Sequence, residues 1–339
     1  MARLTDAAGA DGRSRMLRWL GYPYVRALLA LVLVFCLGLY FNADGAFFRW
    51  ATHRDMLRHS SVYGILACGM TLVIITAGID LSVGSVLGFI AVAFSILSIH
   101  HGWSPWLAIP ACLAIGALLG AVSGALIAAF GIQPFIATLA MMVFARGLAK
   151  FVSHGMKVSN YVQTPEGYVA LDMPAIHGLI DQRILNGNLA VVTLIFLACL
   201  LISHVVLARL RWGRYLYAIG GNEEAARLSG VPVARMKLLA YGLAGFFSAV
   251  AGICQAAQEY QGDPEAGATY ELKAIAIVVI GGTSLMGGRG GILLTLIGTL
   301  TIGYMEKILS INAAGEASRL MLTGAIIVAA VLLQRIRRR

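Results

Sequence analysis

The chain has 339 residues, of which 59% are hydrophobic and only 12% are charged, and its formal net charge is +10. A soluble globular domain carries about 25% charged residues, so this composition excludes an ordinary water-soluble protein. Repeated apolar runs of about 20 residues instead predict an all-α protein that crosses a membrane several times. The basic residues form short clusters beside these runs, which argues against a nucleic-acid-binding surface.

The chain begins with a polar, basic stretch, residues 1–24, and the apolar run after it, residues 27–41, lacks a small-residue cleavage site, so we expect a cytoplasmic tail and not a signal peptide. A transmembrane domain is expected over residues 25–334, followed by a basic cytoplasmic C-terminus at 335–339. About ten spans follow from the apolar runs: 25–41, 61–79, 82–99, 106–130, 134–152, 189–208, 237–258, 271–283, 292–310 and 317–334.

The placement of basic residues predicts the orientation of these spans. Loops rich in lysine and arginine face the cytoplasm, and the most basic internal loop, 209–237, follows the sixth span. Spans that begin inside reach the cytoplasm again after every second crossing, so this loop and both termini fall on the same side. Loops 42–60 and 153–188 are then expected outside.

Asp80 is the only acid in the second to fifth spans, within the stretch AGIDLSVGS at residues 77–85. One interpretation is that Asp80 caps the third span, with Leu81 as its first helical residue, because aspartate is a favoured helix cap. The other is direct contact with a transported solute, since acids in membrane regions often mark pathways. The neighbouring candidate residues are Gly78, Ser82 and Gly84.

A second glycine-rich stretch, GGTSLMGGR at residues 281–289, can be aligned with the Asp80 stretch. If the match reflects a duplication, the fold has two pseudo-repeated halves, and broken or re-entrant glycine-rich segments at matching positions point to a transport site. Glycine is common in membrane helices, so a chance match is the alternative. The candidate residues here are Gly282, Thr283 and Ser284.

The polar starts of the fifth and eighth spans are further pathway candidates. Because proline suits the first helical turn, the simplest interpretation of Pro134 is a helix start. Arg146 and Lys150, four residues apart, are expected to snorkel to the membrane interface. The pathway candidates at these two starts are Gln133, Pro134, Phe135, Thr138, Tyr270 and Glu271.

The polar stretch AIGGNEEAARLSGVPVARMK, residues 218–237, predicts a short cytoplasmic helix. Asn222 is a good N-cap, and Glu223 and Glu224 suit the positive end of the helix dipole. Gly230 suits the left-handed position just after the helix. A helix this short is not stable alone in water, so it must dock either on its own membrane domain or on a partner.

Two features of the sequence resemble known transporters. Glu224-Ala225-Ala226 followed by Gly230 is similar to the first half of the EAA loop of ABC importer permeases, although the usual Ile-x-Leu-Pro continuation is absent. The chain more widely resembles the permeases of ribose-, xylose- and galactose-type sugar importers. The stretches that carry this resemblance are GMTLVIITAGIDLSVGS (69–85), IQPFIATLAMM (132–142), GGNEEAARLSGVPV (220–233) and YELKAIAIVVIGGTSLMGGRG (270–290).

The resemblance implies a permease subunit of a monosaccharide ABC importer in the bacterial inner membrane. A homodimer or heterodimer of permease chains, surrounded by membrane lipid, would enclose the pathway, and a periplasmic or lipid-anchored binding protein would deliver the sugar. A cytoplasmic ATPase subunit would receive the short helix. The implied coupling residues are Asn222, Glu223, Glu224, Ala225, Ala226 and Gly230. Relatives usually have an acid where this chain has Lys273, so a role that rests on that acid does not carry over.

The chain is expected to be no enzyme. It contains no Gly-Lys pair and therefore no P-loop, so ATP-Mg is expected on a separate ATPase subunit and no cofactor on this chain. The histidines and cysteines show no ligand spacing, so neither a metal site nor a catalytic residue is expected.

Two alternatives stay open. A related ABC permease for another solute, such as branched-chain amino acids, would share this architecture. An ion-coupled secondary transporter would need buried acids for its coupling ion, and Asp80 is the only candidate in the first five spans. Such a transporter would not need a docking helix.

Overall fold

The structure is a computed structural model that describes residues 22–164 and 167–315, with a few residues between 317 and 328. A 3-10 turn at Ala46–Phe48 precedes the second helix, and a π-helical turn at Ile96–His100 extends the third. The helices are α2 (Pro23–Tyr40), α3 (Trp50–Ile75), α4 (Val83–Ser95), α5 (Pro105–Phe130), α6 (Pro134–Val152), α7 (Ala175–Asp181), α8 (Val191–Ala208), α9 (Arg211–Gly221), α10 (Glu223–Leu228), α11 (Val233–Glu259), α12 (Tyr270–Gly281) and α13 (Ile292–Ile311).

Within the described residues, eight helices are long and apolar enough to cross a membrane: α2, α3, α4 with its π turn, α5, α6, α8, α11 and α13. These eight correspond to eight of the predicted spans, which confirms an all-α polytopic membrane protein. Predicted span 317–334 lies outside the continuously described residues.

Two predicted span boundaries are wrong. Helix α3 begins at Trp50, well before residue 61, so part of the expected outer loop 42–60 is helical. The predicted span 271–283 is only the 12-residue helix α12. At 1.5 Å per residue this helix is about 18 Å long, too short for a hydrocarbon core of about 30 Å.

The chain before α12 supplies the rest of that crossing. We call residues 260–269 the re-entrant segment, because this irregular chain lies inside the bundle along α4. Its Gly262 packs against the last turn of α4, and its Gly267 packs against Gly84 in the first turn. Irregular backbone at membrane depth is tolerated where protein buries it. Residues 260–269 and α12 thus make one crossing together, and a re-entrant arrangement of the glycine-rich stretch 281–289 stays a prediction.

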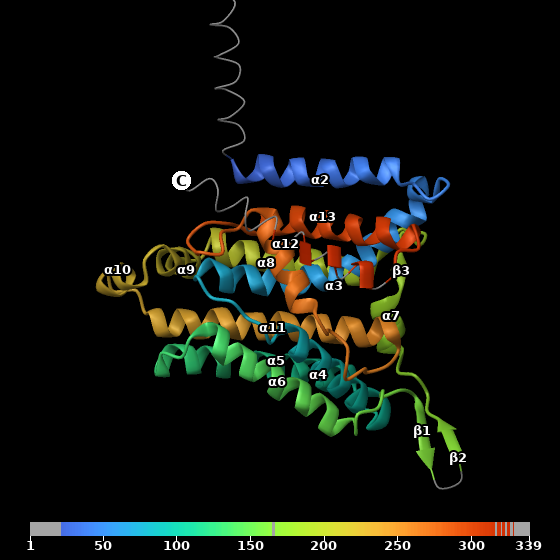
Figure 1. The fold of residues 1–339 in the computed structure, drawn as a ribbon. Helices are drawn as coiled ribbons and strands as arrows, with labels where there is room; N and C mark the ends of the chain where they lie inside the picture. Colours follow the sequence, from blue (N-terminus) through green and yellow to red (C-terminus); the bar gives the residue numbers. More distant parts are fainter. Residues whose placement is uncertain are drawn as a thin grey trace, which may run out of the picture.

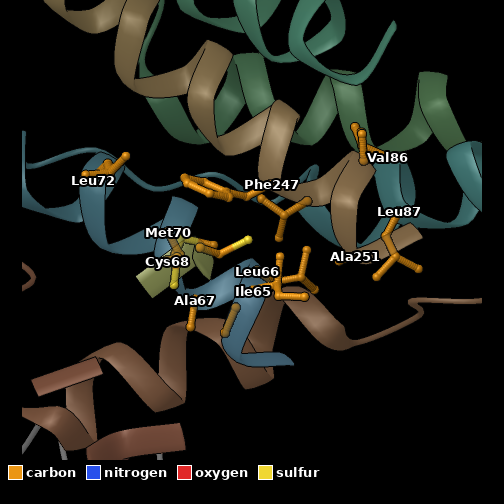
Figure 2. Close-up of a cluster of buried hydrophobic side chains, with 14 of the residues drawn as sticks. Ile65, Leu66, Ala67, Cys68, Met70, Leu72, Val86, Leu87, Phe247 and Ala251 are labelled. Carbon is orange, nitrogen blue, oxygen red and sulfur yellow. The ribbon is translucent and has the colours of Figure 1, made fainter. Parts of the chain in front are cut away.

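The centre of the bundle is built from α3, α4 and α11. Figure 2 shows Leu66 of α3 and Leu87 of α4 beside Phe247 and Ala251 of α11, and all four side chains are buried. Helix α5 packs closely on α11 through glycines four residues apart, where added side chains would meet α11 backbone. Such small-residue stripes let membrane helices approach each other. These glycines are Gly116, Gly120 and Gly124.

The bundle has two distinct ends, and Figure 1 shows them at its left and right. Helices α9 and α10 lie at the first, which we call the α10 end. The second, the hairpin end, carries α7 and two small antiparallel pairs of strands. The first pair is β1 (Tyr161–Thr164) with β2 (Gly167–Ala170), and the second is β3 (Arg183–Ile184) with β4 (Leu189–Ala190).

Candidate functional site

Helix α10 has the predicted start and end. The Asn222 side chain accepts a hydrogen bond from the Ala225 N–H at 3.0 Å, which confirms the N-cap. Gly230 has a φ of 81°, in the left-handed region, as predicted for the residue after the helix. The Val231 N–H then donates to the Ala226 carbonyl at 3.0 Å, which closes the end of the helix. The sequence therefore determines this short helix locally.

The surface of α10 is divided between the bundle and the surroundings. Ala226 is buried against the bundle, whereas Glu224 and Ala225 are exposed. Leu228 keeps 82% of its surface exposed, which is unusual for a large apolar side chain outside a membrane span. The helix therefore docks on its own domain through one face and leaves a mixed polar and apolar face free.

An ion pair joins α10 to α11. Both carboxylate oxygens of Glu223 accept hydrogen bonds from Lys237 Nζ, each at 2.8 Å. Arg227 lies 3.4 Å from Glu223 and from Glu224 and completes a small charged network on α10. A displacement of α10 relative to α11 would break the Glu223–Lys237 pair, because this pair joins the two helices whereas the Arg227 contacts lie within α10.

The break between α3 and α4 contains Asp80. The carboxylate is buried and accepts hydrogen bonds from the Ser82 N–H at 2.8 Å and from the Ser82 hydroxyl at 2.6 Å. The predicted cap is wrong, because the N-cap of α4 is Ser82 and no side chain caps the helix; Asp80 instead forms a tight turn just before it. The predicted opening at Leu81 is wrong, since α4 begins at Val83. The 1% exposure of Asp80 leaves it little surface for direct solute contact.

Other predicted residues surround this break. Thr138 of α6 donates to the Ile79 carbonyl at 3.4 Å, and the Tyr241 hydroxyl of α11 donates to the same carbonyl at 3.5 Å. Gly78 lies against the Tyr241 hydroxyl, so that an added Cβ would collide with it. Pro134 is in the first turn of α6, as predicted. Phe135 is 54% exposed, and its surface is directed outward.

The two glycine-rich stretches that could be aligned in the sequence touch each other. The Gly288 N–H donates to the Ile75 carbonyl at 2.9 Å, and Gly287 packs against Ala77. Gly220 of α9 lies against both the Ile75 carbonyl and the Gly288 N–H. We call this three-way backbone contact the glycine junction. Whether the stretches arose by duplication stays a prediction.

Gly282, Thr283 and Ser284 form the turn that links α12 to α13. Gly282 ends α12 with a φ of 105°. The buried Thr283 hydroxyl accepts from the Gly291 N–H at 3.4 Å, and the Ser284 hydroxyl accepts from the Met286 N–H at 3.3 Å. The turn therefore uses its own polar groups, and these three residues lie outside the hollows described next.

Two adjacent hollows lie beside α10. A pocket of about 320 Å³, the glycine pocket, reaches from Asn222 and Glu223 to Gly78 and Tyr241. A groove of about 920 Å³, the α10 groove, extends along α10 and the start of α11, and Gln133 lines it. The two hollows share Ile127, Pro134, Glu223 and Lys237. The fold thus brings predicted coupling residues and predicted pathway residues to one place.

Tyr270 and Glu271 lie elsewhere, near the middle of the bundle. The Tyr270 ring packs edge-on against the Tyr63 ring of α3, with centroids 4.6 Å apart. Lys273 lies over both rings and pairs with Glu306 of α13 at 2.8 Å. The Lys273–Glu306 pair was not predicted from the sequence. The presence of one acid in the ninth span and one lysine in the eighth could have suggested it.

Basic residues of α6 hold the re-entrant segment, so the expected snorkelling is wrong for Arg146, whereas for the half-exposed Lys150 it stays a prediction. Arg146 donates to the carbonyls of Pro264 and Ala266, the latter at 2.8 Å. Lys150 pairs with Glu265 at 2.6 Å. These side chains face the re-entrant segment because its acid and free carbonyls need donors. Glu271 lies beside Gly84 in the same region, away from the glycine pocket.

A further ion pair at the hairpin end anchors the start of the re-entrant segment. Lys157 pairs with Asp263 at 2.9 Å, and this carboxylate raises the pKa of Lys157 above its ordinary value. Across the part of the chain that the structure describes, no group of three or more histidine, cysteine, aspartate or glutamate residues is placed to hold a metal ion.

Comparison with known proteins gives consistent matches. A protein-family model described as "branched-chain amino acid transport system / permease component" matches residues 54–331. The ribose import permease protein RbsC of Escherichia coli strain K12 is 40% identical over 282 residues, which cover 82% of this chain and 84% of that protein. RbsC of Bacillus subtilis strain 168 is 41% identical, with 83% and 84% covered. The xylose transport system permease protein XylH of E. coli K12 is 32% identical, with 91% and 90% covered. No solved structure matches the chain.

Proposed function

The chain belongs to the family described as the permease component of branched-chain amino acid transport systems, and we propose that it is the membrane-spanning permease subunit of an ATP-driven importer for a monosaccharide. The relatives that match most of its length are ribose, xylose and fructose permeases, which supports a sugar as the solute. Despite the family's description, an amino acid as solute is not favoured by these relatives.

The capped helix α10 carries the proposal. It is short, exposes Leu228 and Glu224, and is tied to the bundle by the Glu223–Lys237 pair. A helix with these properties suits contact with a partner that moves it, since it is fixed at its base and free on its outer face. An ion-coupled secondary transporter would have no use for such a helix, so that alternative is not favoured.

We infer the orientation from charge. The segment 209–237, which contains α9 and α10, is strongly basic, so the α10 end faces the cytoplasm. The hairpin end then faces outward and meets the binding protein that delivers the sugar. The ATPase subunit, which carries ATP-Mg, docks on α10 and the α10 groove. Hydrolysis belongs to that subunit, and this chain supplies the pathway, with a second permease chain across it.

The contacts of α10 suggest how the motion passes inward. Helix α9 leads directly into α10 and contributes Gly220 to the glycine junction. A shift of α10 therefore acts on the ends of α3 and α12 through packed backbone. It also acts on α11 through Lys237, one turn before Tyr241, which contacts the Asp80 loop. Close-packed elements of this kind move between discrete arrangements, because they cannot deform continuously.

Co-purification with a candidate ATPase subunit tests the coupling part of this proposal. We expect Glu224→Lys to reduce the association, because it reverses an exposed charge on the docking face. Gly230→Pro should do the same, because proline cannot adopt a φ of 81°. The matched control is Asp172→Lys, the same kind of charge reversal in an exposed loop at the hairpin end. Unchanged association in Glu224→Lys and Gly230→Pro would contradict the role of α10.

Uptake tests the solute. The permease, its ATPase and its binding protein are reconstituted in vesicles, and uptake of D-ribose, D-xylose and D-fructose is compared with uptake of L-leucine. ATP-dependent uptake of one sugar is the expected result. Uptake of leucine in preference to every sugar would overturn the assignment.

A further inference from the structure

We propose that the glycine pocket is the last binding site of the solute, where one monosaccharide is held weakly before it enters the cytoplasm. This inference rests on the proposed function and adds the site, its residues and its link to α10. The pocket is a second place of interest beside the Asp80 loop, which is too buried to receive a sugar itself.

The size and depth of the pocket suit a single sugar ring. Its volume is about 320 Å³, near the lower end of the range of about 300–1,000 Å³ for small-molecule sites. It extends from Asn222, beside the exposed α10, to Gly78 and the buried Tyr241 in the break between α3 and α4. Broken membrane helices such as the one between α3 and α4 commonly form part of transport sites.

The wall of the pocket offers both donors and acceptors. The Asn222 oxygen caps α10, and within the described residues its NH₂ group has no partner. Lys237 Nζ donates two hydrogen bonds to Glu223, and an ammonium carries a third proton. The Tyr241 hydroxyl makes only a long bond of 3.5 Å to the Ile79 carbonyl. Sugar hydroxyls both donate and accept, so they can satisfy all of these groups.

The helix break adds backbone acceptors. Thr76, Ala77 and Gly78 line the pocket outside any helix. Across the described residues, no backbone N–H donates to their carbonyls. In membrane transporters the unwound backbone of broken helices lines the binding site, and its carbonyls act there as acceptors for bound ions. Backbone carbonyls without an N–H partner at this wall leave acceptors available to a hydroxyl-rich solute.

The pocket should bind weakly, because Glu223 and Lys237 already satisfy each other. A sugar that uses either charge must compete with a pair of hydrogen bonds of 2.8 Å. The last binding site before release must bind the sugar weakly, since a tightly held sugar would block the next transport cycle. Glu223 is also the first residue of α10, so a displacement of α10 by its partner changes the wall of the pocket directly.

Protection of an introduced cysteine tests the site. Gly221 lines the pocket, and an added Cβ there meets no atom within 4 Å, so Gly221→Cys places a thiol in open space. The background variant carries Cys36→Ala, because Cys36 is exposed whereas the other four cysteines are buried. Ala218→Cys, on the exposed face of α9 and outside the pocket, is the matched control. Inside-out vesicles with the full chain are treated with a membrane-impermeant thiol reagent.

We expect D-ribose, D-xylose or D-fructose to slow the labelling of Gly221→Cys by a factor of about 1 + [sugar]/Kd, with saturation, and to leave Ala218→Cys unchanged. Asn222→Ser provides a second readout, because serine still caps α10 but lacks the amide donor. In the Gly221→Cys background it should raise the half-protecting sugar concentration several-fold.

Three results would overturn the inference: no protection by any of the sugars, equal slowing at both cysteines, or protection by L-leucine in preference to the sugars. The outcome is separable from the proposed function. If the reconstituted importer takes up a sugar but Gly221→Cys is not protected, the glycine pocket is not the last binding site, and the permease assignment stands. If the importer takes up no sugar, the assignment itself fails.

Discussion

The two ends of the bundle are held together by different interactions. At the α10 end, the Glu223–Lys237 ion pair fixes α10, but Gly220, Gly288 and Ile75 meet through backbone atoms with no side chain between them. At the hairpin end, charged side chains hold the irregular chain: Arg58 pairs with Asp181, Arg183 with Asp55, Lys150 with Glu265 and Lys157 with Asp263.

The difference has a physical consequence. A backbone contact between glycines tolerates no added atom, so it responds to substitution in an all-or-none way. Ion pairs of partly exposed side chains contribute little each, typically about 0–1 kcal/mol, and salt screens them. The α10 end is thus rigid and can transmit a displacement of α10 to the membrane helices. The ion pairs of the hairpin end can break and form again one at a time. The following predictions test this distinction in order of expected effect.

Gly220→Ala should have the largest effect. Its Cβ would overlap the Ile75 carbonyl and the Gly288 N–H, both backbone atoms that cannot move aside alone. Overpacking costs about 1–3 kcal/mol, and more where backbone must shift, so we expect loss of transport and a clear fall in thermal stability. Gly221→Ala is the neighbouring control, because no atom lies within 4 Å of an added Cβ. Equal transport and equal thermal stability of the two variants would show that the glycine junction is not tightly packed.

Arg146→Met should have the next largest effect. It removes the donors to the Pro264 and Ala266 carbonyls, and hydrogen bonds that involve a charged group contribute about 1.5–3 kcal/mol. Lys150→Met breaks an exposed pair and should cost at most about 1 kcal/mol. Thermal unfolding of the purified variants in detergent measures both. A larger loss in Lys150→Met than in Arg146→Met would contradict the assigned roles.

Substitution of Asp80 should have an intermediate effect that depends on hydrogen bonding and not on charge. Asn can still accept from the Ser82 N–H and hydroxyl, whereas Leu cannot. Loss of a hydrogen bond of this kind costs about 0.5–1.5 kcal/mol, so Asp80→Asn should keep more sugar uptake than Asp80→Leu. If both variants were equally inactive, the charge of Asp80 would matter and the turn would not explain its presence.

The smallest effect concerns pH at the hairpin end. His177 of α7 is buried beside the Ser98 hydroxyl, 3.1 Å from its Nε2, and burial lowers the pKa of His177 below its ordinary value. The folded state then binds fewer protons than the unfolded state, so this contribution is complete above about pH 6.5 and declines as the pH falls below it. The hydrogen-exchange protection factors of residues 175–181, corrected for the intrinsic pH dependence of amide exchange, should fall on acidification. His177→Gln, which does not titrate, should remove that dependence.

The sequence alone was sufficient for features whose causes are local. Long apolar runs identify the membrane class, and eight of the predicted spans are present as helices. The cap by Asn222 and the left-handed Gly230 define α10 from within the stretch 222–230. Asp80 bonds to Ser82, two residues away. In each case the two groups that interact are a few residues apart, so residue type and spacing determine the outcome.

Tertiary structure decided which distant groups meet. Lys273 faces Glu306, and Arg146 faces the carbonyls of the re-entrant segment, although neither side chain carries a signal for its partner in its own neighbourhood. The shortness of α12 and the contact between Ile75 and Gly288 also depend on how the helices pack. A buried charge or a free carbonyl must find a partner inside the bundle, but which one it finds depends on the positions of helices that lie far apart in the chain.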